Sequence, residues 1–203
     1  MPLLEPEQIP SETCARAFDK LFWSFLFLFD LNIGVNEVKV DVLPDLIGWI
    51  LMHSALGSIA SLHSDIPTIR LNVRMLLILS VLDLVSFPIH FDEYNVIIVP
   101  VSIAIGLVQL VLTIMVVWKV CGLVIDIATF SRDTALADQA DFRRKFYIGG
   151  AIFVAAAIGA AFLEKSLILP ALFIGFPWMM IAIGLLMGLM AKTARLCRRG
   201  ASI

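Results

Sequence analysis

The stretch that decides the fold runs from Asn95 to Trp118 and reads NVIIVPVSIAIGLVQLVLTIMVVW. It holds 24 residues and no charged side chain, so as a helix it could cross the apolar core of a bilayer, roughly 30 Å thick. A second uncharged stretch, Ser166 to Ala191, is 26 residues long. Two such segments predict an integral membrane protein.

The composition of the whole chain agrees with this prediction. The 203 residues are 60% hydrophobic and 16% charged, with a mean hydropathy of +0.96. A soluble domain has about a quarter of its residues charged, and a globule of this size has no interior for so much apolar surface. The composition therefore excludes a water-soluble enzyme and a disordered chain. The net charge of -2 also argues against a nucleic-acid partner.

Shorter apolar segments complete the expected bundle. Phe146–Leu163 is rich in Gly and Ala, Leu46–Ser64 carries two histidines, and Met75–Phe91 carries one acid. The shortest candidate, Leu21–Gly34, ends close to Asp30. We therefore expect an all-α fold with six transmembrane helices arranged as three hairpins.

The basic residues indicate the orientation. With six spans, thirteen of the fifteen Lys and Arg residues fall on one side, and the other side has only Lys39 and Lys165. The positive-inside rule then places both termini in the cytoplasm. All three cysteines fall on that side, where thiols stay reduced. The expected parts are a cytoplasmic N-terminal segment (1–20), a single bundle (21–191) with a cytoplasmic helical loop at about 122–145, and a basic tail (192–203).

The cytoplasmic loop is expected to contain one helix, from Ser131 to Lys145. Its weak apolar side suits a helix lying on the inner leaflet, and a surface that docks a partner protein is the alternative. Basic side chains at the end of this helix and in the tail would then contact lipid headgroups: Arg143, Arg144, Lys145, Arg198 and Arg199.

Asp83 is the acidic residue inside the expected span Met75–Phe91. An ionised carboxylate at mid-bilayer costs at least ~2.5 kcal/mol on insertion scales, so it should face the bundle interior, be protonated or have a partner. Counted from the span ends, His53 lies at a similar depth, and consecutive antiparallel helices usually pack together. We therefore expect Asp83 and His53 to form an intramembrane polar pair, either a clamp between helices or a proton-exchanging site.

Acidic side chains and one histidine gather on the outer face of this arrangement: Asp30, Asp41, Asp45, His90, Asp92, Glu93 and Glu164. Carboxylates and imidazole together could bind a divalent cation. Their spacing matches no metal motif, and depletion of basic residues explains an acidic outer face equally well. The sequence therefore predicts no resident cofactor and leaves a bound cation open.

The region from Leu21 to Leu62 carries a phrase, Asp41-x-Leu43-Pro44-Asp45-x-Ile47-Gly48-Trp49-Ile50-Leu51, preceded by Asp30-x-x-Ile33-Gly34. It resembles a family of small bacterial integral membrane proteins of unknown function, which have Tyr at the position of Trp49. A second phrase of that family resembles Trp118-x-x-Cys121-Gly122, an alanine-rich segment and Arg144-x-x-Tyr147. The resemblance implies a multi-pass protein of the bacterial cytoplasmic (inner) membrane, and it implies no activity.

Three functions stay open from the sequence. The chain has no Ser-His-Asp pattern, zinc-binding motif or glycine-rich phosphate loop, which favours a non-enzymatic scaffold or accessory subunit. Such a protein would contact the lipid bilayer and other membrane proteins or a second copy of itself. The alternatives are a small transporter or proton-coupled permease that uses Asp83 and His53, and a membrane-embedded enzyme that uses the outer carboxylates.

Overall fold

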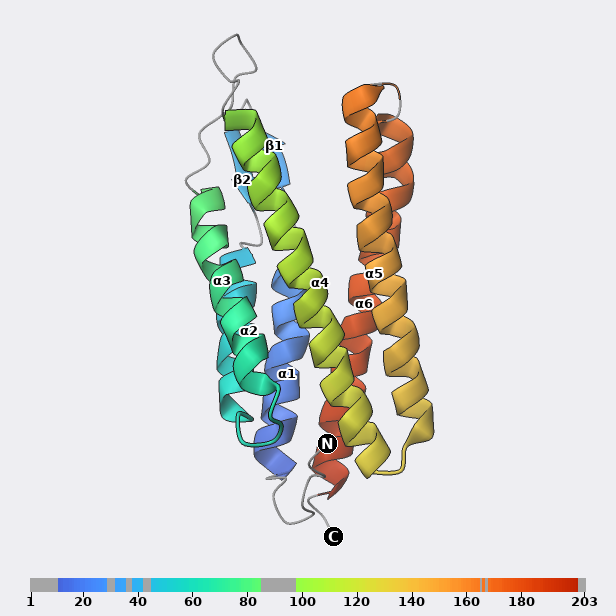
Figure 1. Ribbon diagram of the computed structural model, residues 1–203. Helices are drawn as coiled ribbons and strands as arrows, with labels where there is room; N and C mark the ends of the chain where they lie inside the picture. The colour runs from blue at the N-terminus through green and yellow to red at the C-terminus, as the bar shows by residue number, and fades with distance from the viewer. Residues whose placement is uncertain are drawn as a thin grey trace.

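The computed structural model describes residues 11–28, 32–35, 38–41, 45–84, 98–164, 166 and 168–200. Within these residues the chain forms six α-helices and one small β-hairpin (Figure 1). The elements in chain order are α1 (Ser11–Phe27), β1 (Asn32–Val35), β2 (Val38–Asp41), α2 (Asp45–Ser58), α3 (Ile66–Leu84), α4 (Ile98–Phe130), α5 (Thr134–Leu163) and α6 (Ile168–Gly200).

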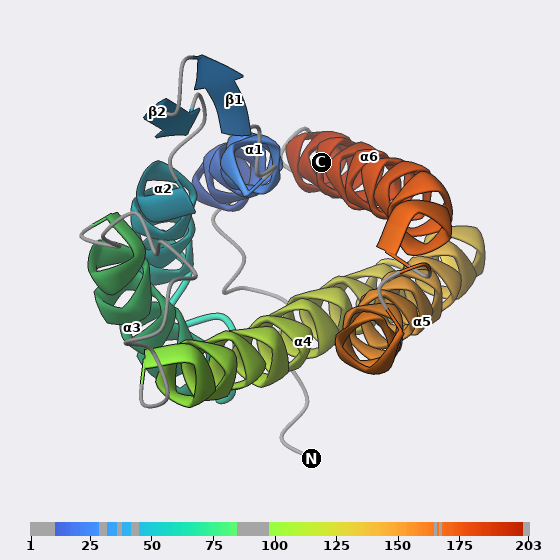
Figure 2. The ribbon, with the colours of Figure 1, turned by 90° about the horizontal axis from the view of Figure 1, so that it is seen from above.

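The helices are arranged as a closed ring. Each helix packs against the next one in the chain, and α1 packs against α6 to complete the circle (Figure 2). Successive helices run in opposite directions, so α1 begins and α6 ends at the same end of the ring (Figure 1). The short β-hairpin pairs Asn32 with Asp41 and Val35 with Val38, between α1 and α2. This up-and-down order agrees with the hairpins expected from the sequence.

One end of the ring, here called the basic end, is where α1 begins, α6 ends, and the turns 59–65 and 131–133 lie. Apart from Lys20, which lies near the middle of α1, every Lys and Arg of the six described helices lies in the half of its helix nearer this end. Arg70 and Arg74 are early in α3, Lys119 is late in α4, and the last turns of α6 hold Arg198 and Arg199. The strongly one-sided charge expected from the sequence is therefore present in space.

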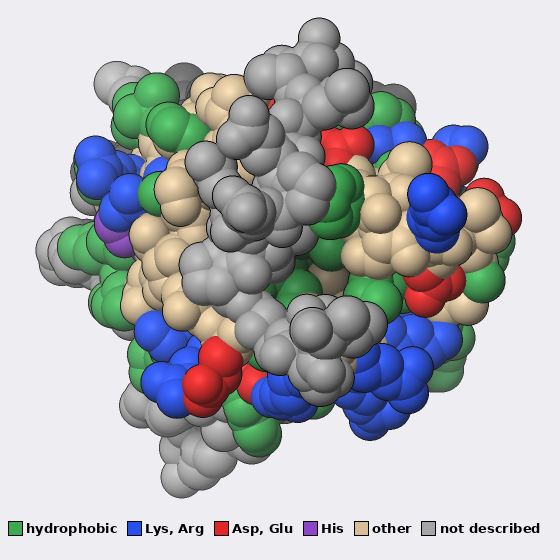
Figure 3. Space-filling view, turned by 90° about the horizontal axis from the view of Figure 1, so that it is seen from below, with side chains coloured by type: hydrophobic (Ala, Val, Ile, Leu, Met, Phe, Trp, Pro, Cys, Tyr) green, Lys and Arg blue, Asp and Glu red, His purple; other side chains and the backbone are tan. Residues whose placement is uncertain are grey.

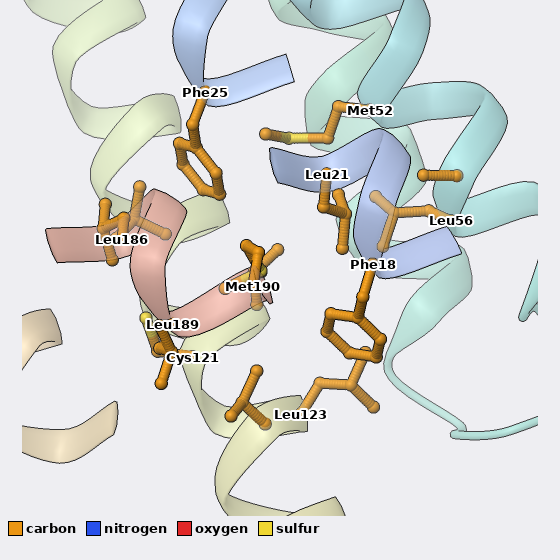
Figure 4. Packing of buried hydrophobic residues seen from close by; sticks show 14 of the residues in the cluster. Phe18, Leu21, Phe25, Met52, Leu56, Cys121, Leu123, Leu186, Leu189 and Met190 are labelled. Carbon is orange, nitrogen blue, oxygen red and sulfur yellow. The ribbon is translucent and has the colours of Figure 1, made fainter. Parts of the chain in front are cut away.

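The half of the ring at the basic end has a tightly packed core, and we call it the packed half (Figure 4). Helix α1 supplies one apolar face, because Cys14, Phe18, Leu21 and Phe25 recur at the three- and four-residue spacing of a helix. This face meets buried side chains from other helices: Met52 and Leu56 of α2, Cys121 and Leu123 of α4, and Leu186, Leu189 and Met190 of α6.

The other half, called the open half, is apolar but little buried. None of the α4 residues from 104 to 115 is buried, although Val116, Val117 and Val120 just below them are. Large side chains are exposed instead, with Leu107 54%, Ile78 58% and Phe173 75% exposed. In water such a surface would cause aggregation, so it indicates an apolar surrounding or an apolar partner.

The connection between α4 and α5 differs from the expected loop at 122–145. Helix α4 continues to Phe130 and α5 begins at Thr134, so residues 134–145 are the first turns of a long helix and not a separate helix on the leaflet. Arg132, with φ of 57°, ends α4 through hydrogen bonds from Asp133 N to Ala128 O and from Arg132 N to Thr129 O. The Asp133 carboxylate then caps α5 by accepting a bond from Leu136 N.

The expected span Leu21–Gly34 is not a single helix. Helix α1 starts ten residues earlier, at Ser11, and ends at Phe27, while residues 32–35 form β1. Two of the described helices contain a segment that is long and apolar enough to cross a membrane: Ala104–Phe130 in α4 and Phe173–Arg199 in α6.

Glycines allow two pairs of helices to approach closely. A Cβ on Gly48 would lie 2.9 Å from the backbone oxygen of Ser24, where α2 crosses α1. A Cβ on Gly150 would lie 2.8 Å from the Trp178 ring. That indole bridges α5 and α6, because its Nε1 donates to the Phe146 carbonyl at 3.2 Å and its ring stacks on Phe153. These contacts hold adjacent helices of the ring in register.

Candidate functional site

The polar contacts of the described residues concentrate at the basic end. Figure 3 shows Lys and Arg side chains at several places around this face, with acidic side chains beside some of them. An ion pair links Arg198 of α6 with Asp19 of α1, and Nε2 of His63 in the α2–α3 turn lies 3.2 Å from Oδ2 of Asp126 of α4. The basic end is thus the part of the molecule where chemistry-bearing side chains meet.

The best-defined cluster joins His53 of α2 to two arginines of α3. The Nε2 atom of His53 accepts a hydrogen bond from Arg74 Nε at 2.9 Å, and Arg70 Nη2 lies 3.5 Å from the same nitrogen. One residue further along α2, Ser54 Oγ accepts a bond from Lys20 Nζ of α1 at 3.2 Å. Helix α3 therefore brings two cations to one imidazole, and Lys20 of α1 bonds to the residue that follows this histidine.

The predicted pair of His53 and Asp83 stays a prediction, because the side chain of Asp83 lies outside the described residues. The described partner of His53 is Arg74, which precedes Asp83 by nine residues of α3, about 13 Å along a helix axis. Helix α2 has 14 residues and ends at Ser58, five residues after His53.

The expected outer acidic cluster can be followed at two side chains. Asp45 starts α2 and is half-buried, and Glu164 ends α5, where its Oε1 accepts a bond from Ser166 N at 3.3 Å. These two residues belong to helices that are not neighbours in the ring. The side chains of the remaining members, Asp30, Asp41, His90, Asp92 and Glu93, lie outside the described residues. Among the described residues no three His, Cys, Asp or Glu side chains are grouped to hold a metal ion.

The predicted headgroup contacts divide into two kinds. Arg143 and Arg144 are half-buried and contact protein: Arg143 donates to the Leu185 carbonyl of α6 at 2.7 Å, and Arg144 stacks on the Trp118 ring with 3.8 Å to its centroid. Burial lowers the pKa of the Arg143 guanidinium. Lys145, Arg198 and Arg199 are exposed, as a headgroup contact requires.

Sequence reasoning missed a polar cleft of about 180 Å³ beside the α2–α3 turn. His63, Asp65, Lys119 and Asp126 line it together with the Trp118 ring. It also missed a thiol pair, since Cys14 and Cys197 are both buried at the contact of α1 with α6. All three cysteines are free thiols, as expected. No signal in the sequence pairs residues so far apart.

Comparison with known protein families, with curated proteins and with solved structures finds no match to this chain. The resemblance built on the phrase around Asp41 and Asp45 therefore stays a prediction. Function has to be argued from the geometry alone.

Proposed function

We propose that this chain is a multi-pass membrane protein of the bacterial cytoplasmic membrane, and that it acts as a non-enzymatic scaffold or accessory subunit for other membrane proteins. Its helices cross the bilayer in six passes, with the basic end and both termini on the cytoplasmic side. The first pass is made by α1 together with the residues that follow it, because α1 alone has 17 residues.

The observation that carries the membrane proposal is that charged residues end at the same level in α4 and α5. Beyond Lys119, towards the opposite end, α4 has no charged residue back to Ile98, and beyond Lys145 α5 has none up to Leu163. The stacking of Arg144 on Trp118 shows that these two boundaries lie side by side. Antiparallel helices that change from charged to uncharged at one level are typical of a membrane interface.

The scaffold role is supported by small residues in the open half. A Cβ placed on Gly106, Gly159 or Gly184 would meet no atom within 4 Å. In a bilayer, where water does not drive helices together, such positions let another helix approach closely. The permease alternative depends on a contact between His53 and Asp83. The described partner of His53 is Arg74, and the side chain of Asp83 lies outside the described residues.

Cysteine labelling tests the topology. Ser166 and Ser131 are exposed residues at opposite ends of the ring, and the three natural cysteines are buried, so background labelling should be low. In intact cells a membrane-impermeant maleimide should label Ser166→Cys, whereas Ser131→Cys should react only after permeabilisation. Equal labelling of both variants in intact cells would contradict the proposed topology.

Photo-crosslinking tests the scaffold role. A photoreactive amino acid in place of Leu107, in the open half, should give one discrete protein adduct in membranes. The same amino acid in place of Phe142, an exposed residue of the basic end, serves as the matched control. Adducts with lipid alone at Leu107 would count against a scaffold or accessory subunit.

A further inference from the structure

The cluster of His53, Arg70 and Arg74 holds positive charge that the described part of the chain does not neutralise. Arg16, Arg144 and Arg198 each form an ion pair with a carboxylate. Among the described residues, no Asp or Glu pairs with Arg70 or Arg74, and both guanidinium groups contact the Nε2 atom of the His53 imidazole. Two arginines one helical turn apart repel each other unless an anion lies between them.

The geometry makes the cluster a donor site. Because His53 Nε2 accepts the bond from Arg74, its lone pair is used and the ring proton resides on Nδ1, which is then a further donor. Arg70 Nε is buried and without a hydrogen-bond partner among the described residues. A buried donor left unsatisfied is costly, so an added acceptor would be favourable here. Guanidinium groups match the oxygens of phosphate in a forked geometry.

The surroundings of the cluster indicate what kind of phosphate-bearing ligand would bind there. His53 is half-buried and Arg74 is exposed. Towards the open half, the same faces of α2 and α3 carry exposed apolar side chains, with Ile50 48% and Ile78 58% exposed. A ligand that follows this surface has an anionic head and an apolar body.

We infer that His53, Arg70 and Arg74 bind the phosphate of an anionic phospholipid whose acyl chains lie along the outer faces of α2 and α3. The inference rests on the proposed membrane location of the chain. It adds a defined lipid site to the exposed lysines and arginines that contact headgroups in general.

Lipid binding to the detergent-purified full chain tests the site, with phosphatidylglycerol, phosphatidylcholine and inorganic phosphate as separate probes. Native mass spectrometry should show phosphatidylglycerol bound at least tenfold more tightly than phosphatidylcholine. Each of Arg70→Gln and Arg74→Gln should weaken phosphatidylglycerol about tenfold, since each removes charge-assisted hydrogen bonds. Arg74→Lys, which keeps the charge and loses the fork, should fall between. The matched control is Arg195→Gln, an exposed arginine of α6, which should bind as the unaltered chain does.

Other outcomes would overturn the inference. Equal losses in Arg195→Gln and Arg74→Gln would mean a general charge effect, and displacement of the lipid by millimolar inorganic phosphate would mean a site for the free anion. Thermal unfolding of each variant separates loss of binding from loss of fold. If Ser166→Cys and Ser131→Cys give the expected labelling while phosphatidylglycerol fails to bind selectively, the lipid site is wrong and the membrane topology stands.

Discussion

The two halves of α4 are both rich in apolar residues but have opposite surroundings. Leu107 and Val108 in the open half are about half exposed, whereas Val120 and Cys121, less than four turns further on, are fully buried. Hydropathy describes what these side chains avoid and does not say what covers them. In the packed half the cover comes from the protein itself, and in the open half the proposed cover is lipid or a partner helix.

The difference follows from the lengths of the helices. Helices α4, α5 and α6 have 33, 30 and 33 residues, while α1 and α2 have 17 and 14. Phe18 and Phe25 of α1 fill the ring at the basic end, but α1 ends at Phe27. The long helices therefore extend past the helix that supplies the interior with large side chains.

The largest difference between the two halves is expected when a leucine is truncated to alanine in each of them. Leu186 is fully buried and Leu107 is 54% exposed. Leu186→Ala should lower the free energy of unfolding by about 2–5 kcal/mol, because it leaves a cavity, and Leu107→Ala should change it by no more than about 0.5 kcal/mol. Equilibrium unfolding in detergent micelles measures both. Equal losses would show that the open half is packed in micelles.

A second matched pair of variants adds a methyl group in each half instead of removing atoms. Gly48→Ala places a methyl group 2.9 Å from a backbone oxygen that cannot easily move, so we expect a loss of about 1–3 kcal/mol. Gly106→Ala meets nothing within 4 Å and should gain up to about 1 kcal/mol from helix propensity. The same unfolding experiment gives both values. A loss of stability in Gly106→Ala would indicate that a neighbour occupies this face in the micelle.

The turn that closes the packed half offers a smaller, stabilising change. Arg132 has a φ of 57°, a region that costs a side chain about 1–2 kcal/mol and glycine very little. Arg132→Gly should therefore raise the unfolding free energy by about 1 kcal/mol. Ser131→Gly, beside it and without a positive φ, should lower stability slightly. If both changes destabilise, the turn has another conformation.

The smallest expected effect is the pH dependence of an exposed ion pair at the boundary of the two halves. Hydrogen bonds from Lys145 and Arg144 lower the pKa of Asp141 from its ordinary 3.8. A lowered pKa in the folded state means that the pair adds stability above the unfolded-state pKa and loses it as pH falls through the folded value. Melting curves of Asp141→Asn and the unaltered chain should converge in this acid range. Curves that stay parallel would refute the pairing.

The sequence predicted where the apolar segments lie better than where the helices begin. Charged residues ended the predicted spans at Leu21, Met75 and Phe146, but the helices start earlier, at Ser11, Ile66 and Thr134. A helix can continue beyond its apolar segment into polar residues, because its backbone hydrogen bonds do not depend on hydropathy. Hydropathy therefore cannot detect these polar turns. The order of the hairpins and the one-sided charge were predictable because both depend on the apolar segments alone.

The candidate site was less predictable for the same reason. Its arginines, Arg70 and Arg74, lie in the extension of α3 that hydropathy treats as a loop, so their contact with His53 was not predicted. A four-residue spacing of two arginines on one helix face was visible in the sequence. The contact of His53 with these arginines could not be predicted without knowing the length of the α2–α3 turn.

The contact between α1 and α6 has a consequence for biosynthesis. Helix α1 leaves the ribosome before α6 and exposes Cys14, Phe18 and Leu21 on one face, and the cover of this face includes α6. The ring therefore cannot close until α6 has been made. A nascent chain that stops before Ile168 presents an uncovered apolar face, the form of intermediate that chaperones and proteases recognise.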